Sequence, residues 1–133
     1  KNMQVRRALI LGALLGCGYA SMLMAEDAAK VDPKHYTVVS ENDQVRILRV
    51  HYGPHEKSVM HSHPASVAVF LSGGNGKFTF PDGKTQDFAA KAGDVQYNAA
   101  TTHLPENTGD QAFDVIVVEL KGKAAKPHKA AAK

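Results

Sequence analysis

The stretch MHSHPASVAVFLSGG, residues 60–74, places two histidines one residue apart, just before an apolar run that ends in glycines. A short run rich in Val and Phe is typical of a β-strand. Successive side chains of a strand point to opposite faces, so His61 and His63 would project from the same face. Two ring nitrogens placed in this way can converge on one ion if another strand supplies a third donor.

The rest of the chain has the same strand-like composition. Runs rich in Val, Ile, Phe and Tyr predict strands at 36–40, 45–52, 66–72, 77–80, 85–90, 94–98 and 113–120. Pro81-Asp82-Gly83 predicts a hairpin turn, because Asp-Gly supplies the positive φ angles that such turns need. A second turn is predicted at 72–76 and a loop at 104–110, and only the N-terminal segment has a helical pattern. Many short strands predict an all-β antiparallel sandwich or barrel.

The length of 133 residues leaves room for one packed domain. We predict a signal segment at 1–25, a lead-in at 26–35, the domain at 36–120 and a flexible Ala/Lys-rich tail at 121–133. Residues 26–120 hold 8 basic and 13 acidic side chains. This mildly acidic balance argues against nucleic acid as a partner.

Residues 1–25 have the pattern of an export signal. A basic start, KNMQVRR, precedes 18 apolar or small residues, which is typical of a secretory signal peptide with cleavage after Ala20 or Ala25. Two alternatives remain open. The sequence LLGC resembles a lipoprotein box in which Cys17 would be lipidated, and the apolar run is near the lower limit for an uncleaved membrane anchor. All three predict a secreted or periplasmic protein, with membrane attachment only in the last two cases.

His103 is the natural third donor for the two neighbouring histidines. It follows a predicted strand and a turn of small residues, so a barrel can place it opposite His61 and His63. Each histidine taken alone is as consistent with a surface or packing role. On the strand before His103, Gln96 and Tyr97 are adjacent, so only one can point inward. An inward Tyr97 would donate a hydrogen bond to a bound oxygen species; its alternative role is packing in the barrel core.

Together these segments resemble the two motifs of the cupin family. GPHEKSVMHSHPASVAVFLSGG (53–74) resembles the first, with a glycine, then His-x-His, then a glycine near a hairpin. GDVQYNAATTHLPEN (93–107) resembles the second, with a Gly-Asp start and a histidine followed four residues on by Asn107. The resemblance covers residues 36–120 and implies a double-stranded β-helix, or jelly-roll barrel, with a metal inside one end. The implied ligands are His61, His63 and His103.

One departure from the family pattern changes the implied metal site. In the family pattern three or four residues separate His-x-His from the usual acidic ligand, and this chain has Val67 and Ala68 at the two corresponding positions. The site then resembles the three-histidine subset of cupins, which includes thiol and diketone dioxygenases. Ligation by imidazole alone suits Cu, Fe, Ni and Zn better than Mg or Mn. We expect one transition metal ion per chain, copper first and iron next, with Zn, Ni or Mn as other occupants.

The resemblance implies an exported mononuclear oxidoreductase that uses O2 or H2O2. In size, export and ligand set the chain is similar to small exported cupins that use copper to oxidise polysaccharides such as cellulose, so the expected substrate is a polysaccharide or a small molecule. The chain has no tryptophan, so a sugar-stacking surface would need Tyr36, Tyr52 or Phe88 to cluster on one face. The alternatives are a non-redox metal-dependent isomerase or lyase, and a cupin that binds a metal or small ligand without turnover. A homodimer is expected because cupins commonly dimerise through strands, with the apolar run 115–120 as one candidate.

Overall fold

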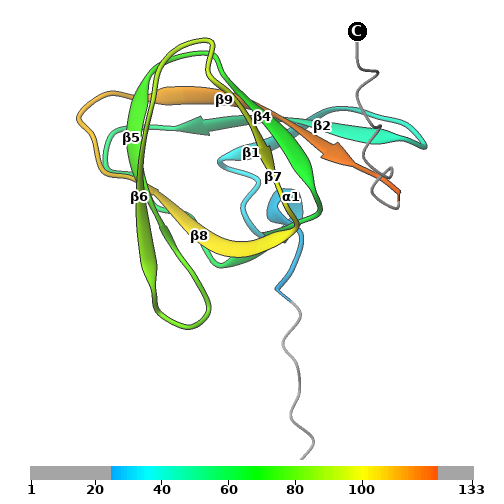
Figure 1. Ribbon diagram of the computed structural model, residues 1–133, viewed down its shortest axis with the longest axis horizontal. Helices are drawn as coiled ribbons and strands as arrows, with labels where there is room; N and C mark the ends of the chain where they lie inside the picture. Colours follow the sequence, from blue (N-terminus) through cyan, green and yellow to red (C-terminus); the bar gives the residue numbers. More distant parts are fainter. Residues whose placement is uncertain (1–24, 123–133) are drawn as a thin grey trace, which may run out of the picture.

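The computed structural model describes residues 25–122, which form an all-β barrel made of two facing antiparallel sheets (Figure 1). The first sheet has the order β1-β2-β9-β4-β7 and the second the order β3-β8-β5-β6. The strands of the first sheet are β1 (Tyr36–Glu41), β2 (Val45–Tyr52), β4 (Ser66–Phe70), β7 (Val95–Asn98) and β9 (Phe113–Leu120). Those of the second are β3 (His61–His63), β5 (Gly74–Thr79), β6 (Thr85–Ala90) and β8 (Thr101–Asn107). The predicted all-β jelly roll is confirmed.

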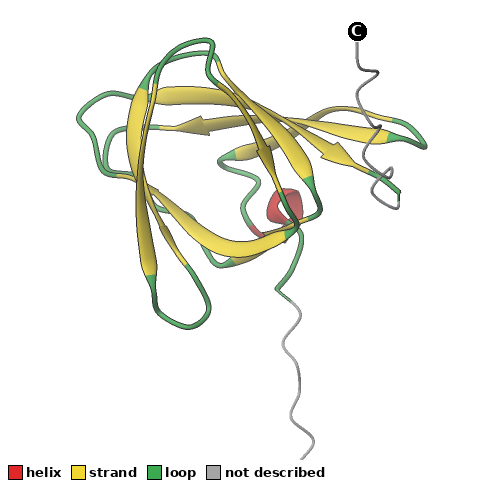
Figure 2. Ribbon diagram, viewed as in Figure 1, coloured by secondary structure: helices red, strands yellow, loops and turns green. Residues whose placement is uncertain are grey.

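Strands make up nearly all of the regular structure, as Figure 2 shows. The exception is a short helix, α1 (Ala28–Val31), which the sequence pattern did not reveal. It is capped by the side chain of Asp27, which accepts a hydrogen bond from the backbone N–H of Lys30, and it packs against β1 and β3. The predicted signal segment up to residue 24, with Cys17, and the tail from 123 onward lie outside the described residues. Within residues 25–122 no helix has the length and apolar content to cross a membrane.

Strands distant in sequence lie side by side in the first sheet. β2 and β9 pair along their whole length, from Val45 opposite Leu120 to Tyr52 opposite Phe113. The other edge of β9 pairs with β4, so both edges of this strand are hydrogen-bonded inside the barrel. The apolar run 115–120 therefore has no free edge for pairing with a second chain, and burial of Val115 in the core accounts for part of its hydrophobicity. The homodimer itself stays a prediction.

The core lies between the two sheets and follows the alternation of the strands. In β4, Ser66, Ala68 and Phe70 are buried, while Val67 and Val69 are partly exposed on the outer face. The inward residues pack on the other buried apolar side chains. These are Ala28, Tyr36, Leu48, Val50, Tyr52, Phe113 and Val115.

The predicted hairpin is confirmed: β5 and β6 pair up to Thr79 opposite Thr85, and Gly83 has a φ of 83°. The turn predicted at 72–76 is shorter than expected, because Gly74 and Gly76 belong to β5. A Cβ on Gly74 would lie 2.5 Å from the ring of Phe113, and one on Gly76 would lie 2.3 Å from the ring of Phe88. These glycines make room for aromatic side chains in a strand rather than form a turn.

The loop predicted at 104–110 is also wrong in its first half, since β8 continues to Asn107. A loop was predicted here because Pro105 lacks the N–H group that a strand residue donates to the neighbouring strand. In the barrel, Pro105 pairs with Phe78 of β5 on one side. On the other side of β8, the pairing with β3 extends only as far as His103. Beyond that point the backbone N–H of Ser58 donates a hydrogen bond to the carbonyl oxygen of Pro105. No hydrogen bond from the proline nitrogen is needed there.

Candidate metal centre

Three imidazoles meet at one end of the barrel. His61 and His63 come from β3, and the pairing of β3 with β8 sets His61 directly opposite His103. The ring centroids are 4.8 Å apart for His61 and His63, 5.1 Å for His61 and His103, and 5.4 Å for His63 and His103. One ligand nitrogen from each ring lies within 4.8 Å of the others. The structure thus brings together the three residues predicted from sequence, in an arrangement that can hold a metal ion.

Hydrogen bonds at Nδ1 set the tautomer of two of these rings. Nδ1 of His61 lies 2.8 Å from the carbonyl oxygen of Val59. Because a carbonyl can only accept, this nitrogen carries the proton. Nδ1 of His63 lies 2.7 Å from a carboxylate oxygen of Glu119, so it donates as well. In both rings the lone pair is left on Nε2, the atom that a metal would bind.

Two ring nitrogens of the cluster have no protein partner. Nε2 of His61 and Nε2 of His103 are buried and make no hydrogen bond. Burial, with a contribution from the neighbouring imidazoles, lowers the pKa of His61 to about 4 and that of His103 to about 3. These two rings are therefore neutral at pH 7, with lone pairs available for a cation.

Glu119 is a functional residue that the sequence analysis missed. It is 1% exposed and comes from β9, in the sheet opposite His63. Its second oxygen accepts from Arg46 at 2.6–2.7 Å, and Arg46 also pairs with Asp27, just before α1. A carboxylate in the same register as the inward apolar residues of β9 was the available signal, because a buried charge needs a partner.

A second polar group lies behind His61. The carboxylate of Asp32 accepts from Ser58 and meets Nδ1 of His35 at 2.6 Å. The other ring nitrogen of His35 lies 3.0 Å from Glu56. Ser58 Oγ is 3.4 Å from Nδ1 of His61, so this group adds only a weak contact to the imidazole cluster. It ties the lead-in before β1 to the barrel.

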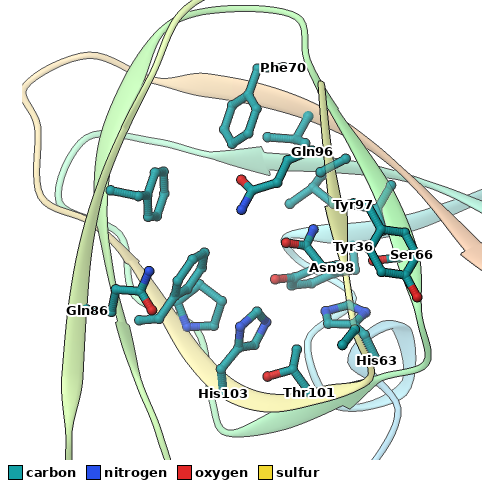
Figure 3. A pocket seen from close by; sticks show the side chains of 18 of the residues that line it. Tyr36, His63, Ser66, Phe70, Gln86, Gln96, Tyr97, Asn98, Thr101 and His103 are labelled. Carbon is teal, nitrogen blue, oxygen red and sulfur yellow. The ribbon is translucent and has the colours of Figure 1, made fainter. Parts of the chain in front are cut away.

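A cavity of ≈ 380 Å³ opens from His63 and His103 into the barrel. Figure 3 shows these two imidazoles at one end of the cavity, beside Thr101, with Phe70 at the other end. Ala68 is one of the two positions at which the family motif usually has an acidic ligand. Its side chain lines the cavity, and the residue is 7% exposed. The methyl group at this position leaves space where a carboxylate would reach inward.

Gln96, rather than Tyr97, projects into the cavity. Gln96 pairs with Ala68, which faces inward, whereas Tyr97 pairs with Val67 on the outer face. Tyr97 is 61% exposed and lies at the cavity edge beside Ser66 in Figure 3, where the Gln96 amide points to the interior. The structure therefore does not place Tyr97 for the inward hydrogen bond considered from the sequence.

His51, His55 and Asn107 lie away from the imidazole cluster. His51 contacts Asp114 on the outer face at 3.2 Å, and His55 contacts Asp110 at 2.6 Å in an exposed loop. Asn107 is buried; its amide N–H groups donate to the backbone carbonyls of Gly53 and Gln111, and its Oδ1 accepts from Gly109 N–H at 2.9 Å. It fixes the turn and does not face the imidazoles.

The tyrosines considered as a surface for sugars are interior residues. Tyr36 and Tyr52 are both buried, and their hydroxyls are 2.8 Å apart. Burial raises the pKa of both phenols, so both stay protonated. The expectation that they could form an exposed stacking platform is wrong, because the barrel closes over both rings.

Comparison with known proteins agrees with this architecture. Residues 48–119 match the family model of the cupin domain. Similar solved structures include a cupin domain from Bordetella pertussis Tohama I, with 21% identity and a TM-score of 0.61 over 65% of this chain and 92% of that chain. A double-stranded β-helix protein from Klebsiella pneumoniae has 24% identity and a TM-score of 0.54 over 68% and 78% of the two chains. A cupin superfamily protein from Desulfitobacterium hafniense DCB-2 has 18% identity and a TM-score of 0.51 over 65% and 76%. These likenesses show the fold, and among curated proteins no relative matches.

Proposed function

Because the chain belongs to the cupin family, we propose that His61, His63 and His103 hold one transition metal ion and that the protein is a metal-dependent oxidoreductase. The observation that carries this proposal is the pair of buried Nε2 atoms without a partner, on His61 and His103. A buried polar atom left without a hydrogen bond costs about 1–3 kcal/mol. Two such atoms aimed at a common point are explained if a cation binds there.

The donor set fits a transition metal. Three imidazoles lie together, and the carboxylate that contacts them, Glu119, is paired with His63 and Arg46. Imidazole donors favour Cu, Fe, Ni and Zn over the hard cations that prefer oxygen. Copper is the first candidate and iron the second, and either would supply one-electron redox and oxygen chemistry when bound.

The surrounding residues have identifiable tasks in such a site. Glu119 and the Val59 carbonyl hold the Nδ1–H groups of His63 and His61, which fixes both rings with Nε2 facing the site. Phe78 stacks on His103 with 4.8 Å between the ring centroids and 17° between the planes. The apolar wall would reduce the amount of water around a bound substrate.

The proposed substrate is a small molecule rather than a polysaccharide. The imidazoles lie inside the barrel, at the end of an interior cavity. A polymer is bound more readily by an exposed aromatic platform, and Tyr36 and Tyr52 are not available for one. Cavities of this size typically enclose most of a small ligand.

The proposal includes location and assembly as predicted from the sequence. The signal pattern of residues 1–25 supports action outside the cytosol, in the periplasm or the medium. A homodimer is proposed as the assembly, and its interface would not form by edge pairing of β9, because both edges of that strand are already paired.

Metal titration of protein purified without a histidine tag tests the proposal. After removal of metals with a chelator, Cu(II), Fe(II) and Zn(II) are added separately, and bound metal is measured after desalting. We expect one equivalent of metal per chain, with binding lost in His61→Ala and His103→Ala. His51→Ala and His55→Ala are matched controls, because both imidazoles are exposed and lie on other surfaces.

The outcomes separate the candidate functions. Tight Cu or Fe binding with reductant-dependent consumption of O2 or H2O2 supports an oxidoreductase. Stoichiometric Zn binding with no redox response of any loaded form would assign the site to a non-redox isomerase or lyase. Failure to retain any metal would overturn the metal site and leave a binding protein without an ion.

A further inference from the structure

The wall of the cavity is aromatic along its length. The chain has five phenylalanines, and all of them line this cavity. They are Phe70, Phe78, Phe80, Phe88 and Phe113. Phe78 stacks on His103 on one side and on Phe88 on the other, with 4.7 Å between the Phe78 and Phe88 centroids and 23° between their planes. A continuous aromatic surface therefore runs from one of the imidazoles into the barrel.

The same wall carries no formal charge. None of the lining residues in the described part of the chain is Asp, Glu, Lys or Arg. A carboxylate or phosphate group lying along this wall would lose its hydration without gaining a partner of opposite charge. An anion could pair with a metal at the imidazoles, so the exclusion applies to the part of a ligand that extends away from them.

Neutral hydrogen-bonding groups replace charges in the cavity. Gln86 comes from β6 and Gln96 from β7, each an edge strand of its sheet. Figure 3 shows both side chains at the cavity, with Asn98 between Gln96 and the imidazoles. Amides both donate and accept hydrogen bonds. They suit hydroxyl and carbonyl groups on an otherwise apolar ligand.

We propose that the cavity binds a neutral molecule with one or two aromatic rings and a hydroxyl or carbonyl substituent, and that this is the substrate class of the site. The volume of ≈ 380 Å³ lies near the lower end of the range for small-molecule pockets, about 300–1,000 Å³. As a statement about substrate, the inference rests on the proposed function. Binding by the aromatic wall does not depend on a metal.

Fluorescence titration of the metal-free protein tests the inference. The probe is 2-naphthol, which is neutral at pH 7, and the matched charged probe is 2-naphthoate. The chain has no tryptophan, so naphthalene emission can be excited without background from the protein. We expect saturable binding of 2-naphthol with one site per chain, and at least about tenfold weaker binding of 2-naphthoate. Equal affinities, or no binding of 2-naphthol, would overturn the inference.

Two substitutions locate the site within the barrel. Ala68→Phe fills the cavity and should abolish 2-naphthol binding, whereas Val67→Phe, its neighbour on the outer face, should leave it unchanged. Gln96→Arg adds a cation to the wall and should reverse the preference in favour of 2-naphthoate. If Ala68→Phe fails to fold, the affinities of the wild type and of Gln96→Arg for 2-naphthol and 2-naphthoate still test the inference. Unchanged selectivity in Gln96→Arg would place the probe elsewhere and contradict the inference.

The two proposals fail in different ways. If 2-naphthol binds as expected and the chain retains no metal, the cavity assignment stands and the oxidoreductase proposal is wrong. If metal binds to the three histidines and 2-naphthol does not enter the cavity, only the substrate class is wrong.

Discussion

A carboxylate oxygen of Glu119 lies 2.7 Å from Nδ1 of His63, across the barrel from the strand that carries the histidine. The chain lacks an acidic residue at the position where the family motif usually has one, since Val67 and Ala68 occupy it. The buried carboxylate of this site instead lies behind an imidazole, where it orients the ring by accepting a hydrogen bond from its Nδ1–H. Arg46 balances the charge of Glu119 and connects it to Asp27.

Replacing Glu119 by glutamine should weaken metal binding while keeping a hydrogen bond to His63. Loss of the carboxylate charge lowers the basicity of the ring, and changes of this kind typically cost about 10–100-fold in metal affinity. We expect the Kd for Cu(II) or Zn(II), measured by competition with a chromophoric chelator, to rise within that range. Asp114→Asn removes a carboxylate from the outer face of the same strand and should leave Kd unchanged. Equal Kd values for Glu119→Gln and wild type would contradict the role of Glu119.

The metal-free protein should lose stability as the pH falls from about 7 to 5. His61 and His103 have folded-state pKa values of about 4 and about 3, below the value of about 6.5 for an unfolded chain. Between these values the unfolded state binds protons that the folded state excludes, so protonation favours unfolding. The free energy of unfolding should fall by about 2 kcal/mol for each imidazole at pH 5.

Urea titrations in the presence of a chelator measure this effect. His103→Phe, which cannot titrate and can still stack on Phe78, should remove about half of the loss. A metal-free protein as stable at pH 5 as at pH 7 would show that the two imidazoles are not buried in neutral form.

Gly76→Ala should destabilise the barrel, because its Cβ would lie 2.3 Å from the ring of Phe88 and 2.8 Å from the backbone oxygen of Glu106. Overpacking of this kind costs about 1–3 kcal/mol. The matched control is Gly109→Ala, where the nearest atom to the added Cβ is 3.4 Å away. Thermal unfolding of both variants should show a clear drop in Tm for Gly76→Ala alone. Similar Tm values would contradict the close packing of β5 on the aromatic wall.

Expression of the full chain with its N-terminal segment should yield a processed protein. The signal pattern predicts an intact mass that corresponds to cleavage after Ala20 or Ala25, or a diacylglyceryl adduct on Cys17 if the lipoprotein alternative holds. Mass spectrometry of the fraction outside the cytosol distinguishes these products. An unprocessed protein found only in the cytosol would contradict the predicted export.

The sequence predicted best those features in which the pattern of neighbouring residues indicates the same structure that the folded barrel requires. The His-x-His spacing required a shared strand face, and the pairing of β3 with β8 places His61 opposite His103. The Asp82-Gly83 turn is similarly local, since its positive φ is a property of the turn itself. The His-x-His spacing and the turn need only short-range geometry.

The parts missed depend on contacts between distant segments. Gly74 and Gly76 are residues typical of a turn. In the barrel they lie in a strand, where the absence of a side chain makes room for the rings of Phe113 and Phe88. Pro105 is a residue typical of loops, but it fits in β8 because β3 ends before it, so that no strand there needs a hydrogen bond from its nitrogen. Glu119 had no motif to identify it, because its partners His63 and Arg46 are 56 and 73 residues away.

X-ray absorption spectroscopy of the loaded, tag-free protein tests the central claim most directly. For Cu or Zn, we predict three imidazole nitrogens at about 2.0–2.1 Å, with one imidazole lost in His103→Ala. A first coordination shell with fewer than three imidazoles, or one that is unchanged in His103→Ala, would show that the three rings do not bind a common ion.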